Sequence, residues 1–214
     1  MPNESAPESA NEPGDLGGAS EVEKADVELG AKLASQRDHP LAKAAGKASK
    51  IGDQGPLYAI SAGVLIVALA SRDRRLARSG VSMLAAVGGA DLSKRLAKAL
   101  VRRTRPHVLL DEHRYEADPG GSERKPEQSF PSGHTACSVA AARALSRDYP
   151  QAGVAAGLAA VAIGISRVAK GAHWPLDVIG GAVIGLAAEA GSARLIRLTL
   201  RLAPSRARCR SSWL

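Results

Sequence analysis

Three short segments of the chain combine basic side chains with histidine, serine and aspartate. They are residues 98–106 (KALVRRTRP), 131–134 (PSGH) and 166–177 (SRVAKGAHWPLD). A tetrahedral phosphate needs several donors that approach from different directions, and arginine supplies a planar fork of donors that stays charged at any working pH. Lys98, Arg105 and Arg167 would form such a cage. The residue types therefore point to chemistry on a phosphate group.

The third segment also contains groups suited to nucleophilic catalysis, and the second contains a helix start suited to phosphate binding. His173 and Asp177 are four residues apart and share one face if the segment is helical. The carboxylate can then hold one ring nitrogen and leave the other free to attack, although Pro175 between them makes the turn irregular or marks a helix start. Ser132 precedes an alanine-rich run and predicts another helix start, where Gly133 allows close backbone approach and free N–H groups favour an anion.

The first segment is expected to be helical. Lys98 and Arg105 are seven residues apart, about two helical turns, so both side chains would leave from one face. Taken alone, the basic residues here are also consistent with the flank of a membrane helix, and Ser132 is consistent with an ordinary helix cap. The combined spacing of Ser166, Arg167, His173 and Asp177 is not easily explained by structural requirements.

In order and spacing, the three segments resemble the signature of the type 2 phosphatidic acid phosphatase superfamily. In outline this signature is Lys-x6-Arg-Pro, Pro-Ser-Gly-His and Ser-Arg-x5-His-x3-Asp, and every fixed position is matched. The resemblance implies that Lys98, Arg105 and Arg167 bind phosphate, and that Ser132 and the Gly133 backbone add donors.

The same resemblance implies a covalent mechanism. His173 would be the nucleophile that forms a phosphohistidine, and Asp177 would orient it. His134 would protonate the leaving oxygen and then activate water. No metal or other cofactor is expected. His107, Asp111 and His113 lie in a charged segment without a metal-ligand frame, and we interpret this segment as a solvated loop.

The elements that must position these residues are five apolar stretches with almost no strand signal between them. They run over residues 56–70, 80–92, 134–145, 152–165 and 175 to about 200. Each uninterrupted stretch is shorter than the roughly 20 residues that span a bilayer, so a soluble bundle also remains open. The fold class predicted is all-α, a helical transmembrane bundle of about five or six helices. Members of the resembled family usually have six spanning helices, so the first is missing here or replaced by residues 25–50.

Composition divides the chain into three parts. Residues 1–50 form a polar tail, disordered to about residue 25 and then a weakly amphipathic helix interrupted near Pro40, either on a membrane surface or solvated. Its acidic start argues against a cleavable signal. Residues 51–203 form the helical phosphatase domain, and residues 204–214 form a basic tail.

The leading functional interpretation is a multi-pass protein of the cell membrane. It would hydrolyse the phosphate or diphosphate headgroup of a lipid such as phosphatidic acid, phosphatidylglycerol phosphate or a polyprenyl phosphate or diphosphate. The net charge of +8 does not by itself choose between nucleic acid, an anionic membrane and an anionic substrate. We expect no nucleic-acid partner, because a contact strip at residues 194–210 would leave the histidine spacing unexplained.

Other readings remain open. The chain is also compatible with a soluble acid phosphatase or a haloperoxidase-like member of the same superfamily, or with a non-enzymatic binder of anionic membranes. Arginines at residues 72–78, at 147 and in the C-terminal segment predict a cytoplasmic side opposite the active site, whereas Lys43, Lys47 and Lys50 favour the reverse. The substrate and the oligomeric state are left open.

Overall fold

The computed structural model describes Leu16 and residues 18–202, so the predicted basic tail and most of the predicted disordered segment lie outside the described residues. The helices are α1 (Glu21–Ala34), α2 (Pro40–Ala48), α3 (Gln54–Ser71), α4 (Arg74–Leu100), α5 (Pro106–Glu112), α6 (Gly133–Ser146), α7 (Pro150–Ala169) and α8 (Pro175–Leu202). Single 3-10 turns occur at η1 (Ser49–Gly52) and η2 (Lys125–Glu127). The all-α prediction is confirmed.

One small feature was not predicted. Strands β1 (Val101–Arg103) and β2 (Ala117–Pro119) form a two-stranded antiparallel ribbon in which Arg102 lies opposite Asp118. The ribbon follows α4 directly, so it ends that helix and turns the chain toward α5.

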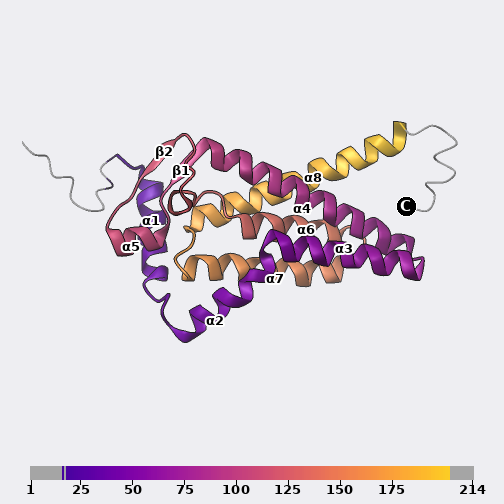
Figure 1. Cartoon of the computed structure of the whole chain (residues 1–214), viewed down its shortest axis with the longest axis horizontal. Coiled ribbons are helices and arrows are strands. Elements are labelled where there is room, and N and C mark those ends of the chain that lie inside the picture. Colours follow the sequence, from indigo (N-terminus) through magenta and orange to yellow (C-terminus); the bar gives the residue numbers. More distant parts are fainter. Residues whose placement is uncertain (1–15, 17, 203–214) are drawn as a thin grey trace, which may run out of the picture.

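Five helices form the body of the molecule. Helices α3, α4, α6, α7 and α8 run along the long axis, while α1, α2, α5 and the β ribbon gather at one end (Figure 1). Helix α6 is central, because it contacts α4, α7 and α8 extensively and α3 more weakly. The five apolar stretches of the sequence correspond to these five helices.

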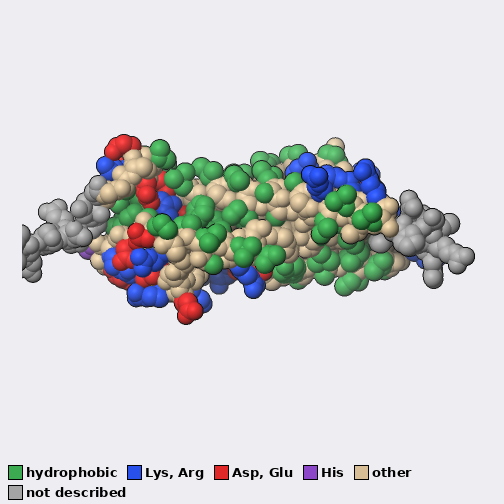
Figure 2. Space-filling view, turned by 90° about the horizontal axis from the view of Figure 1, so that it is seen from above, with side chains coloured by type: hydrophobic (Ala, Val, Ile, Leu, Met, Phe, Trp, Pro, Cys, Tyr) green, Lys and Arg blue, Asp and Glu red, His purple; other side chains and the backbone are tan. Residues whose placement is uncertain are grey.

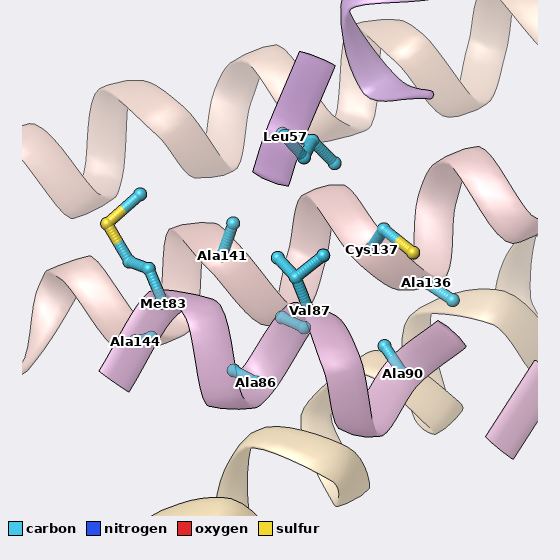
Figure 3. Close-up of a cluster of buried hydrophobic side chains, with 10 residues drawn as sticks. Leu57, Met83, Ala86, Val87, Ala90, Ala136, Cys137, Ala141 and Ala144 are labelled. Carbon is cyan, nitrogen blue, oxygen red and sulfur yellow. The ribbon is translucent and has the colours of Figure 1, made fainter. Parts of the chain in front are cut away.

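The core between α3, α4 and α6 is built largely from small side chains. Figure 3 shows Ala86, Val87 and Ala90 of α4 in one cluster with Ala136 and Cys137 of the adjacent α6. All five are fully buried. Small side chains let helix backbones approach closely, which favours packing in lipid, where the hydrophobic effect does not drive helices together.

The contact between α6 and α8 depends on glycine. A Cβ atom added at Gly181 would lie 2.5 Å from the Ser132 carbonyl oxygen, and one added at Gly185 would lie 2.4 Å from that of Ala136. Both distances are too short for any other residue without a backbone shift. The start of α6 is therefore held directly against the start of α8, which brings the second and third motifs together.

Among the described residues, three helices are long and apolar enough to cross a membrane. They are α3, α7 and α8, and only 17%, 33% and 22% of their most apolar windows are buried inside the protein. Exposed apolar side chains on these helices include Ile66, Val67, Leu69, Val154, Leu158, Val161, Ile179, Val183 and Leu195. Figure 2 shows apolar side chains over the middle of the molecule and charged ones gathered toward its ends. Such a surface suits a lipid environment.

The N-terminal helices pack on the bundle. Helix α1 begins at Glu21, earlier than expected, and the break before Pro40 matches the prediction. The composition of this segment did not indicate that it contacts α5, α7 and α8. The contact is close, because a Cβ atom at Gly30 would lie 2.4 Å from the Trp174 ring.

The glycine contact yields a test of the packing. We expect Gly185→Ala to lower the stability of the protein by about 1–3 kcal/mol, because the added methyl group overpacks the α6–α8 contact. Gly191→Ala is the matched control on the same helix, since nothing lies within 4 Å of its added Cβ atom. That control should stabilise the helix by up to about 1 kcal/mol. Thermal unfolding in detergent measures both, and equal midpoints for the two variants would contradict the packing described.

Candidate active site

The three motif segments meet at the end of the bundle that also contains α1 and α5. They border a cavity of about 310 Å³, which is lined by Asp53, Gln54, Lys94, Lys98, Arg105, Gly133, His134, Arg167 and His173. Every site residue expected from the sequence lines this cavity except Ser132 and Asp177, which are fully buried beside it.

The expected helical link between Lys98 and Arg105 is wrong. Helix α4 ends at Leu100, strand β1 follows, and Arg105 precedes the first turn of α5. The two side chains nevertheless face the same cavity, because the ribbon turns the chain back. The ammonium of Lys98 donates to the Gln128 carbonyl oxygen at 2.6 Å, and the same oxygen accepts from Arg105 Nη2 at 3.5 Å.

The two arginines of the cavity have unused donors. Arg167 lies in the last turn of α7 and is 8% exposed. Within the described part of the chain, the buried Nε atoms of Arg105 and Arg167 have no hydrogen-bond partner. Burial, and then repulsion by the Arg167 guanidinium, lower the pKa of Arg105. Unpaired buried donors are costly, so an anion in this cavity would relieve both the missing hydrogen bonds and the charge repulsion.

His173 lies in the loop between α7 and α8 and is buried. Its Nδ1 atom lies 2.8 Å from the Ser129 carbonyl oxygen. A carbonyl oxygen only accepts, so Nδ1 carries the proton and Nε2 keeps its lone pair. Burial lowers the pKa of His173 to about 4, although Asp177 acts in the opposite direction. The ring is therefore neutral near pH 7 and has a free nitrogen available for nucleophilic attack.

Asp177 lies in the first turn of α8 and is completely buried. Its Oδ2 atom accepts from the Ser129 hydroxyl at 2.5 Å and from the Trp174 backbone N–H at 2.8 Å. The same atom lies 3.7 Å from His173 Nδ1, within range of a charge interaction but beyond a hydrogen bond. The carboxylate thus binds Ser129 and Trp174, and the His173 ring donates its Nδ1 hydrogen bond to the Ser129 carbonyl oxygen and not to Asp177.

The second motif starts helix α6, as the sequence predicted. Ser132 precedes its first turn, and its Oγ atom accepts from the Thr135 hydroxyl at 3.0 Å. The Ser132 backbone N–H donates to the Asp177 carbonyl oxygen at 2.9 Å, which joins the second motif to the third. Gly133 lies close to Lys94, since an added Cβ atom would be 3.0 Å from the lysine Cδ atom.

His134 faces an acidic side chain that the sequence did not indicate. Its Nε2 atom lies 2.6 Å from Asp53 Oδ1, although the angle does not satisfy a hydrogen bond. Asp53 immediately precedes α3 and its side chain is 48% exposed. A negative group therefore stands at the mouth of a cavity whose other charged side chains are cationic.

Other contributors were also missed. Lys94 lies one turn before Lys98 on α4, so its spacing of four residues was a signal for a shared face. Its ammonium contacts Gln54 Oε1 at 2.6 Å and Asp91 Oδ1 at 2.8 Å. Asp53 and Ser129 gave no comparable signal, because only folding brings their segments to the histidines.

Comparison with solved structures shows the fold. The chain is similar to the LpxE protein of Aquifex aeolicus, with 23% identity, a TM-score of 0.55 and coverage of 78% of this chain and 94% of that one. It is also similar to a transmembrane PAP2-type phosphatidylglycerolphosphate phosphatase of Bacillus subtilis, with 23% identity, a TM-score of 0.56 and coverage of 85% and 89%.

Curated relatives match over shorter regions. A non-specific acid phosphatase of Salmonella typhi is 38% identical over 89 residues, which is 42% of this chain and 35% of the relative. A lipid A 1-phosphatase of Rhizobium etli is 33% identical over 106 residues, which is 50% of this chain and 45% of the relative. The matches thus span less than half the length of these relatives. The family model of the PAP2 superfamily matches residues 79–199, more than half of the chain and all three motifs, and the chain therefore belongs to the PAP2 superfamily.

Proposed function

We propose that the protein is a phosphatase that acts on the phosphate or diphosphate headgroup of a membrane lipid through a phosphohistidine. The observation that carries this proposal is the pairing of a neutral His173 with the unpartnered buried donors of Arg105 and Arg167 in one cavity. A nucleophile without a proton on Nε2 and buried donors suited to an anion are the two halves of a phosphoryl-transfer site.

The first step transfers the phosphoryl group to the enzyme. His173 Nε2 attacks phosphorus and the bond from phosphorus to the lipid oxygen breaks. His134, which becomes protonated when the anionic headgroup fills the cavity, gives its proton to that oxygen. Lys98, Arg105 and Arg167 would bind the phosphoryl oxygens, with the N–H groups at the start of α6 as further donors. These donors are positive charges and backbone N–H groups, so the proposed steps use no metal ion.

The second step restores the enzyme. His134, now neutral, takes a proton from water while the oxygen attacks phosphorus. The bond between phosphorus and His173 Nε2 breaks, inorganic phosphate leaves, and His134 is again protonated. The carboxylate of Asp177 lies 3.7 Å from the ring, where it stabilises the positive charge that the ring gains when Nε2 is phosphorylated.

A lipid substrate is supported by the surface of the protein. The cavity lies at one end of a bundle whose helices α3, α7 and α8 expose apolar side chains. An amphiphilic substrate would place its headgroup in the cavity and keep its chains in lipid. We also propose that α3, α4, α6, α7 and α8 all span the membrane, with the arginines at the turn from α3 to α4 at the end opposite the cavity.

A second candidate is hydrolysis of water-soluble phosphate monoesters, which is favoured by the identity with the acid phosphatase. The test is phosphate release by the purified protein in detergent from phosphatidic acid, phosphatidylglycerol phosphate, polyprenyl diphosphate and p-nitrophenyl phosphate. We expect kcat/KM for at least one lipid to exceed that for the soluble ester. A preference for the soluble ester over every lipid would favour the second candidate.

The nucleophile is tested by substitution. We expect His173→Ala to reduce turnover by at least about a thousandfold and to abolish an acid-labile phosphoenzyme, because the proposed first step transfers the phosphoryl group to His173 Nε2. His113→Asn is the control, since His113 lies at the end of α5 in the left-handed region that asparagine tolerates. Rapid quenching with radiolabelled substrate measures the phosphoenzyme. Near-normal turnover in His173→Ala would exclude this nucleophile.

The charge of Asp53 gives a separate prediction. We expect Asp53→Asn to bind inorganic phosphate more tightly by roughly tenfold, because it removes a negative charge that faces the same cavity as the anion. Competitive inhibition by phosphate measures the effect. Asp111→Asn is the control, since Asp111 is exposed and pairs with Arg37 instead of lining the cavity. Weaker phosphate inhibition in Asp53→Asn would show that the carboxylate supports the cage instead of opposing it.

A further inference from the structure

Arg103 lies behind the candidate active site and is not a fixed position of the family signature. Its side chain is 7% exposed and contacts the carboxylates of Asp26 and Asp177 closely, with that of Glu23 farther away at 3.6 Å. Nη1 donates to Asp177 Oδ1 at 2.8 Å, and Nη2 donates to Asp26 Oδ2 at 2.7 Å. One guanidinium therefore joins the carboxylate beside His173 to a carboxylate of helix α1.

Asp26 is also bound to the helix that carries Asp177. Its side chain is 3% exposed, and its Oδ1 atom accepts from the backbone N–H of Leu176 at 2.8 Å. That N–H belongs to the first turn of α8, where N–H groups have no partner within the helix. Asp26 thus binds the start of α8 through its Oδ1 atom and binds Arg103 through its Oδ2 atom.

The arginine is held on its remaining sides by aromatic groups. Its Nε atom donates to the Tyr115 hydroxyl at 3.1 Å, and its guanidinium carbon lies 5.8 Å from the centre of the Trp174 ring. The Trp174 ring donates in turn to the Thr104 carbonyl oxygen at 2.7 Å. These contacts leave the guanidinium little freedom, so its position is set before any substrate binds.

The charges of this group have a consequence for the nucleophile. Asp177 and Arg103 alone would form a neutral pair, whereas the additional carboxylates of Asp26 and Glu23 on Arg103 make the group as a whole anionic. The ring of His173 becomes positive when its Nε2 atom is phosphorylated. An anionic group 3.7 Å away stabilises that positive ring more than a neutral pair would.

We propose that Asp26 and Arg103 are positioning residues for the nucleophile His173. Asp26 holds Arg103, Arg103 holds Asp177, and Asp177 holds Ser129, whose carbonyl oxygen accepts the Nδ1 proton of His173. Helix α1 is accordingly part of the catalytic apparatus, although it contains none of the motifs. This proposal rests on the proposed function, since it assigns a role in forming the phosphohistidine.

The first test is Asp26→Asn in the full chain. The amide oxygen can still accept from Leu176, so the start of α8 keeps its hydrogen bond while the charge on Arg103's second partner is lost. We expect kcat and the rate of phosphoenzyme formation to fall by about tenfold, the scale seen when an outer partner of a functional histidine is removed. KM and inhibition by inorganic phosphate should stay within about twofold, because the cage is untouched. Asp111→Asn is the control. It breaks the ion pair between Asp111 of α5 and Arg37, which follows α1, and it leaves the contacts of Asp177 unchanged.

The adjacent arginines supply a second matched pair. Arg103→Lys keeps the charge but cannot bridge two carboxylates with a planar fork, so we expect the same loss in kcat. Arg102→Lys is its control, because Arg102 points outward to Asp118 at 2.9 Å. If Asp26→Asn fails to fold, as judged by elution from a sizing column in detergent, Arg103→Lys and its control carry the test.

A double-mutant cycle separates positioning from a general loss of stability. In an Asp177→Asn background, Asp26→Asn should lower kcat by less than about twofold, because the link it acts through is already broken. The positioning role would be overturned if Asp26→Asn lowered kcat by the same factor, about tenfold, in the Asp177→Asn background as in the wild type. Equal kcat for the single variants Asp26→Asn and Asp111→Asn would also overturn it. Wild-type protein that hydrolyses substrate without a phosphohistidine would instead overturn the proposed function, so the two failures are distinguishable.

Discussion

The buried carboxylate of Asp177 is the point on which the active-site end of the molecule depends. It has no contact with solvent, so each of its oxygens must be satisfied by the protein. Ser129, the Trp174 backbone and Arg103 supply these hydrogen bonds from three separate parts of the chain. Removing any one donor leaves a buried charge less well compensated, and the same contacts set the position of His173.

The close contact between α6 and α8 makes that arrangement possible. Gly181 and Gly185 remove the side chains that would separate the two helices. The Ser132 N–H can then reach the Asp177 carbonyl oxygen at 2.9 Å. The same small-residue packing suits a helix bundle whose outer surface is apolar, because close van der Waals contact replaces the hydrophobic drive that is missing in lipid. The small residues at the contact between α6 and α8 therefore account both for the close helix packing and for the geometry of the site.

The sequence by itself determined the fold class and most residues of the candidate site. Apolar runs of helical length fixed the five long helices, because burial and lipid exposure both require such runs. The motif spacing identified Lys98, Arg105, Arg167, His134 and His173, and the structure places all of them around one cavity. The two side chains reach the cavity although the segment between Lys98 and Arg105 is not a continuous helix. The motif spacing therefore indicates that the residues share a site, without specifying the backbone conformation between them.

Only the tertiary structure decided which groups surround that signature. Asp26, Asp53 and Ser129 lie in segments whose composition is that of ordinary polar helices and loops. Their roles arise from contacts between residues far apart in the chain, such as the hydrogen bond between Asp26 and Arg103. A local sequence pattern indicates helices and motif residues, because both depend on residues that are close together in the chain. A hydrogen bond between distant segments depends on how the helices pack, and no local pattern contains that information.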